Sequence, residues 1–128
     1  MSRQAFSRSE LHRLARAEVE AILAELPEPL REKAKALPVT YARRPNAAQR
    51  HDGIEADTLG LFLGSGFADE ESAALPLPAQ IVLFLDNIWA LAEEEGERFD
   101  EEVRTTYLHE LGHYLGLDED DLLDRGLE

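Results

Sequence analysis

The chain has 128 residues, a net charge of −14 and no cysteine. This length is that of one domain, residues 1–128, with enough chain to bury a hydrophobic core. Without cysteine there are no disulfides, thiolate zinc sites or iron–sulfur clusters, so His, Asp or Glu must bind any metal. Residues 1–50 carry a net charge of +4 and residues 51–128 carry −18. The acidic part repels phosphate backbones, which argues against a nucleic-acid partner.

Neither a membrane span nor a secretory signal is expected. The longest apolar runs, residues 81–85 and 88–92, are far shorter than the roughly 20 residues that cross a bilayer. The N-terminus leads into a charged amphipathic stretch without the apolar run of a signal peptide. We therefore expect a cytoplasmic protein with no membrane partner.

The N-terminal quarter of the chain predicts two helices. Ser7 and Glu10 have the spacing of a capping box, and apolar residues then recur at helical spacing from Leu11 to Leu26. Pro27 ends that helix, because proline lacks the backbone N–H that a helix interior needs. Residues 28–37 predict a second, shorter helix.

Three strand-like segments follow, at residues 39–42, 59–63 and 80–85. The third is apolar enough to be a central strand. Residues 45–57 and 64–79 are expected to be loops, and the longer one can form a wall of a binding cleft. The fold class is therefore α+β, with helices packed around a short sheet.

The C-terminal part predicts three more helices. The first runs from Asn87 to Glu95, with Trp89 in the core, and Gly96 ends it. Asp100 is expected to cap the next helix, residues 101–115, and Gly116 is its natural C-terminal stop. Residues 118–124 predict a last short helix.

The helix expected at residues 101–115 contains the H-E-x-x-H motif in the form His109-Glu110-Leu111-Gly112-His113. Residues four apart lie one above the other on a helix, so His109 and His113 can bind one Zn²⁺ through their imidazoles. Glu110 is offset from that row and can act on a metal-bound water without binding the metal. The sequence therefore predicts a zinc site, with Glu110 as general base.

A third ligand is expected shortly after the motif. Gly116 allows a left-handed backbone turn, after which the chain can double back under the metal. Glu119, three residues on, is the favoured third ligand. Asp118 is its competitor, although that residue is also well placed to cap the final short helix.

Residues 102–119, together with residues 59–62 and 80–88, resemble the minimal zincin-like metallopeptidases of bacteria. The resemblance implies a stripped-down zincin fold, with a short mixed sheet and an active-site helix that carries His109, Glu110 and His113. Members of that family more often carry Asp at the position of Glu119. The longer side chain here changes the reach to the metal, which concerns ligand geometry and not ligand type.

Three other metalloprotein classes fit less well. Metzincins have His at the position of Glu119 and a methionine turn downstream, but the only methionine is Met1. Peptide deformylases need a cysteine ligand. The three-histidine metalloproteins of RNA maturation also need His at position 119. The resulting hypothesis is a zinc-dependent peptidase acting on a peptide or protein substrate. The alternative is a zincin-like protein whose metal serves structure or ligand binding without turnover.

A peptidase also needs a hydrogen-bond donor for the developing oxyanion and a place for its substrate. The candidate donors, by side-chain chemistry alone, are Tyr41, His51, Tyr107 and Tyr114. Tyrosines are more often core or surface residues than catalytic ones. An extended substrate can add to a sheet edge, and residues 59–63 or 81–85 are the candidate edges.

Overall fold

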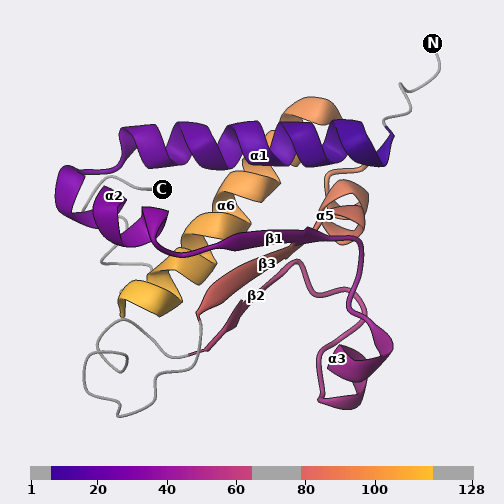
Figure 1. The fold of residues 1–128 in the computed structure, drawn as a ribbon. Coiled ribbons are helices and arrows are strands. Elements are labelled where there is room, and N and C mark those ends of the chain that lie inside the picture. Colours follow the sequence, from indigo (N-terminus) through magenta and orange to yellow (C-terminus); the bar gives the residue numbers. More distant parts are fainter. Residues whose placement is uncertain (1–6, 65–78, 117–128) are drawn as a thin grey trace.

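The structure is a computed structural model that describes residues 7–64 and 79–116. Its elements, in chain order, are α1 (Arg8–Glu25), α2 (Glu28–Lys35), β1 (Val39–Ala42), α3 (Ala47–His51), β2 (Gly60–Leu63), β3 (Gln80–Phe84), α5 (Leu85–Leu91) and α6 (Gly96–Leu115). Helices and three short strands share the chain, which confirms the α+β class (Figure 1). Most of the loop expected at 64–79 and all of the helix expected at 118–124 lie outside the described residues.

The three strands form a mixed sheet, as expected, and their order in it is β1-β3-β2. β1 runs parallel to β3, with Val39 opposite Ile81, whereas β2 runs antiparallel to β3, with Gly60 opposite Leu83. β3 is central, in keeping with its apolar side chains on both faces. The expectation that residues 81–85 offer an edge to a substrate is wrong, because β3 has a partner strand on each side.

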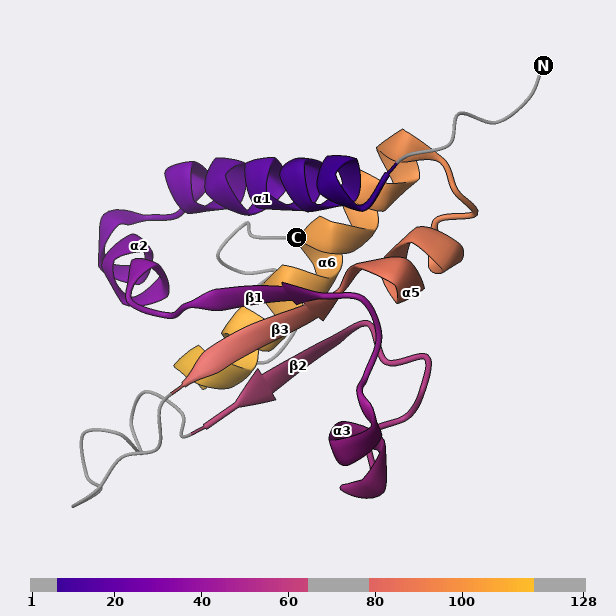
Figure 2. The same cartoon turned by 45° about the vertical axis from the view of Figure 1, so that its right-hand side comes forward.

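α6 packs against one face of the sheet, where it contacts β2 and β3, and α1 lies across α6 (Figures 1 and 2). The shared core is formed by the apolar stripe of α1, by alternate residues of β3 and by one side of α6: Leu11, Ala15, Val19, Ile22, Leu26, Ile81, Leu83, Val103, Tyr107 and Leu111. The helix that carries the sequence motif is therefore held between the sheet and α1.

Two predictions about helix packing are confirmed. The Ser7 side chain accepts a hydrogen bond from the backbone of Glu10, and the Glu10 side chain accepts one from Ser7, which completes the capping box of α1. Trp89 packs against the core, with its ring 5.7 Å from that of Phe99.

The junction before α6 differs from the sequence expectation. α5 ends at Leu91, because Glu93 and Glu94 adopt left-handed backbone conformations with φ of 55° and 60°. Gly96 does not end a helix but begins α6, and Asp100 lies inside it instead of capping it. Phe99 is the physical reason for the earlier start, since its fully buried side chain anchors this first turn in the core.

The segment expected to be a loop at 45–57 contains the short helix α3, which begins with a capping box formed by Asn46 and Gln49. None of the described helices is long and apolar enough to cross a membrane.

Candidate metal centre

The motif occupies the last two turns of α6, where it brings three potential ligands together. One ligand atom each from His109, Glu110 and His113 lies within 4.8 Å of the others. The two imidazole rings are 4.5 Å apart between centroids, with an angle of 63° between their planes. Oε1 of Glu110 lies 3.3 Å from Nδ1 of His113. The i, i+4 spacing thus produces the facing imidazoles that the sequence predicted.

The three side chains differ in their exposure to solvent. The imidazoles of His109 and His113 are exposed, whereas Glu110 is buried. The Glu110 side chain is only 10% exposed, against 53% for His113. A ligand arriving from solvent therefore meets the two imidazoles first, with the carboxylate beside and below them.

The burial of Glu110 results from the close approach of β2 to α6. A Cβ atom built on Gly60 would lie 3.4 Å from Cγ of Glu110 and 2.6 Å from Cγ2 of Thr106. The second distance is shorter than carbon atoms tolerate, so only glycine fits between the strand and the helix. Gly60 thereby lets β2 cover the stem of the Glu110 side chain.

The motif itself does not point to Gly60, although the sequence carries a signal for it. A glycine inside a strand pattern often marks a close approach of two backbones. Phe62, two residues on, is another residue that the motif does not point to. Its ring lies 5.8 Å from that of Tyr114 and packs the same strand against the last turn of α6.

α6 ends as predicted, at Gly116. This residue has φ of 72° and ψ of 27°, and its N–H donates to the carbonyls of Gly112 and His113. A left-handed glycine that satisfies the last carbonyls is a common way to end a helix. Glu119 and Asp118, the two candidate third ligands, lie beyond it and outside the described residues.

The four candidate oxyanion donors have different environments. Tyr107 is fully buried, and Tyr114 is buried against Phe62. Tyr41 is half-buried and packs edge to face on the ring of His12. His51 is exposed on α3. Tyr107 and Tyr114 are therefore core residues, the alternative to a role as oxyanion donors.

The donor set fits a zinc ion. Zinc accepts imidazole nitrogen and carboxylate oxygen at about 2.0–2.2 Å, so ligand atoms that share a tetrahedral ion lie roughly 3.4 Å apart. The observed atoms lie within 4.8 Å, and both imidazoles are exposed. The two exposed rings are therefore close enough together to be reached by one ion from solvent.

Comparisons of the sequence with known proteins identify a family for the chain. No curated protein matches the chain. A family model described as zincin-like metallopeptidase matches residues 34–127, which include all three strands and the whole motif helix. Since this match covers well over half of the sequence, the chain belongs to the zincin-like metallopeptidase family.

Proposed function

We propose that the protein is a zinc-dependent peptidase in which His109 and His113 bind the metal and Glu110 is the general base. The observation that carries the proposal is the contrast between two exposed imidazoles and a buried carboxylate within 4.8 Å of them. A metal that serves structure alone has no need of an additional carboxylate held in this position. Family membership supports the same reaction class.

Each residue then has a separate task. His109 and His113 hold the ion on the open side of α6, and Glu119 is the proposed third ligand. When bound, zinc would supply a Lewis acid that polarises a carbonyl and lowers the pKa of a water molecule. The Glu110 carboxylate takes a proton from the attacking water and later returns it to the leaving amine. The close approach of Gly60 to Cγ of Glu110 restricts the stem of this side chain.

We propose further that a substrate peptide binds as an extended strand along β2. β2 is an edge of the described sheet, and its first residue, Gly60, lies against Glu110. A peptide that adds to this edge by backbone hydrogen bonds would run past the proposed base. Binding through the backbone also suits substrates of varied sequence.

The decisive test separates metal binding from turnover. Glu110→Gln is nearly isosteric but cannot accept a proton, so we expect it to retain about one zinc per chain and to lose roughly 10²–10⁴-fold in hydrolysis rate. His109→Ala is expected to lose the metal. Glu101→Gln, an exposed acid on the same helix, is the matched control and should behave like wild type.

The readouts are zinc content by elemental analysis and cleavage of a mixed library of unstructured peptides, with a chelated sample as blank. Equal cleavage by wild type and Glu110→Gln would contradict the role of the base. If the wild type binds zinc but cleaves nothing, the metal serves structure or ligand binding without turnover.

The third ligand has its own test. We expect Glu119→Ala to weaken zinc binding more than Asp118→Ala does, because Glu119 follows the left-handed Gly116 by three residues. Zinc titration of the two variants against a competing chelator compares them directly. A larger loss of affinity in Asp118→Ala would reverse the assignment.

A further inference from the structure

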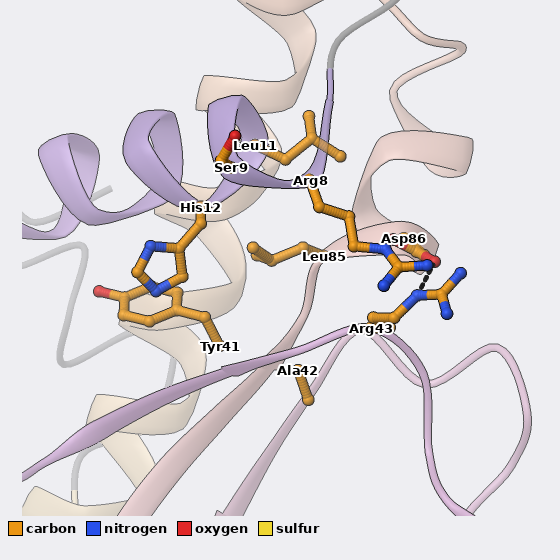
Figure 3. Close-up of a pocket in the computed structure, with 9 residues that line it drawn as sticks. All are labelled: Arg8, Ser9, Leu11, His12, Tyr41, Ala42, Arg43, Leu85 and Asp86. Atoms are coloured by element: carbon orange, nitrogen blue, oxygen red, sulfur yellow. Dashed lines mark hydrogen bonds and ion pairs between the residues drawn. The ribbon is translucent and has the colours of Figure 1, made fainter.

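A cavity lies away from the metal centre, between the first turns of α1, the end of β1 and the start of α5 (Figure 3). Its volume is about 360 Å³, within the usual range for small-molecule sites. The walls are largely apolar, with Leu11 and Leu85 between its two ends (Figure 3). None of the described residues that line it belongs to β2 or to the metal-binding motif. It is therefore separate from the proposed peptidase site.

One end of this cavity is basic. The Arg8 and Arg43 side chains both reach this end, where Asp86 also lies (Figure 3). Oδ2 of Asp86 is 3.2 Å from Nε of Arg43 and 3.8 Å from Nε of Arg44. The Arg8 side chain has no ion pair or hydrogen bond within the part of the chain that the structure describes. Two guanidinium groups thus share one carboxylate and a third, that of Arg8, reaches the same end of the cavity, an excess of positive charge in a chain of net charge −14.

This excess is available to a ligand without leaving Asp86 unpaired. The Asp86 side chain is only 17% exposed, so losing its last cationic partner would be costly. Because two arginines share it, Arg43 can turn to a ligand while Arg44 keeps the ion pair. Arg8 and Arg43 together then offer the planar donors that bind a carboxylate well.

The other end of the cavity is aromatic. The rings of His12 and Tyr41 meet edge to face with their centroids 4.7 Å apart (Figure 3). This pair and the two leucines form an apolar surface that suits an aryl or alkyl group. The cavity is therefore amphiphilic, with charge at one end and an apolar body between the leucines and the rings.

We infer that this cavity binds a small organic acid, a carboxylate with an apolar body about the size of a phenylalkanoate. An adjoining hollow shares Arg8 and Asp86, but Glu93 and Glu94 also line it and would repel an anion. The charge distribution therefore directs the carboxylate ligand to the smaller cavity. This inference does not depend on the proposed peptidase function.

The probe is 3-phenylpropionate, titrated into the full-length ¹⁵N-labelled protein and followed by backbone amide shifts. We expect shifts confined to the first turns of α1, the end of β1 and the start of α5, with a dissociation constant on the order of 1 mM or lower. The neutral 3-phenylpropionamide should bind at least about tenfold more weakly, because it loses charge-assisted hydrogen bonds. Equal binding of acid and amide would mean that the arginines do not select the ligand.

Paired variants test the arginines directly. Arg8→Gln/Arg43→Gln should weaken the acid at least about tenfold and leave the amide unchanged. Arg13→Gln, which removes an exposed charge from α1 without touching the cavity, is the control and should bind like wild type.

A carboxylate is also attracted to a metal ion, so the titration is repeated with chelator and on His109→Ala. Binding that persists unchanged in both supports the cavity. Loss of the shifts in either sample, or no shifts at all in the wild type, would overturn the proposal.

Discussion

Replacing Gly60 by alanine perturbs the contact between β2 and α6 that buries Glu110. The added Cβ would lie 2.6 Å from Cγ2 of Thr106, whereas carbon atoms pack at about 3.5–4.0 Å. The strand and helix must therefore separate by roughly 1 Å, and overpacking of this kind typically costs about 1–3 kcal/mol. For a chain of this size, each kcal/mol lowers the melting temperature by roughly 4 °C. We expect a drop of about 4–12 °C on this basis.

The assay is thermal and urea unfolding followed by circular dichroism, with Thr106→Ser as the partner variant. Serine keeps the hydroxyl but lacks the Cγ2 methyl, so Gly60→Ala/Thr106→Ser should regain most of the lost stability. Thr106→Ser alone should cost only about 1 kcal/mol for the lost methyl group. The displacement of Glu110 should also slow peptide hydrolysis, by up to roughly 100-fold. An unchanged urea midpoint for Gly60→Ala, or no rescue by serine, would refute the packing argument.

Three further predictions concern stability. Tyr107→Phe removes a buried hydroxyl that has no hydrogen-bond partner among the described residues, so it should leave stability at pH 7 unchanged or raise it by up to about 1 kcal/mol. Burial raises the pKa of the Tyr107 phenol in the folded protein. Wild type should therefore lose stability as the pH rises above about 10, where the tyrosine of the unfolded chain ionises. The urea midpoint of the phenylalanine variant should fall less steeply over the same pH range. Glu93→Gly relieves a left-handed backbone conformation and should raise the free energy of unfolding by about 0.5 kcal/mol. Glu101→Gly, inside α6, should instead lower the free energy of unfolding by about 0.5–1 kcal/mol. A lower free energy of unfolding in both variants would contradict this prediction. Ser7→Ala removes the cap of α1 and should cost about 0.5–2 kcal/mol in thermal unfolding, and a smaller loss would mean that Glu10 alone holds the turn.

The features that could be predicted from sequence are those set by residues close together in the chain. Ser7 and Glu10 form the capping box of α1 because its geometry spans only one turn. The imidazoles of the motif face each other because i, i+4 spacing brings them together on any regular helix. Gly116 ends α6 because glycine adopts the left-handed conformation without a steric cost.

The features that could not be predicted depend on contacts between distant segments. α6 begins at Gly96, earlier than Asp100 suggested, because Phe99 is drawn into the core and holds an extra turn. A cap pattern carries no information about such an anchor. The basic cavity combines Arg8 with Arg43 and Asp86, which are more than 30 residues away along the chain. No local pattern connects them.

The burial of Glu110 also couples the proposed base to the proposed substrate edge. The motif spacing alone places this carboxylate next to the imidazoles, but the low exposure of its side chain depends on β2, which lies against it at Gly60. The same strand would bind the peptide. A substrate that pairs with β2 would therefore affect the packing of Gly60 against the stem of Glu110. Peptide binding and base position should therefore vary together. A change at Gly60 that displaces β2 is expected to alter both KM and kcat, whereas Glu110→Gln should alter kcat alone, since it leaves the strand in place.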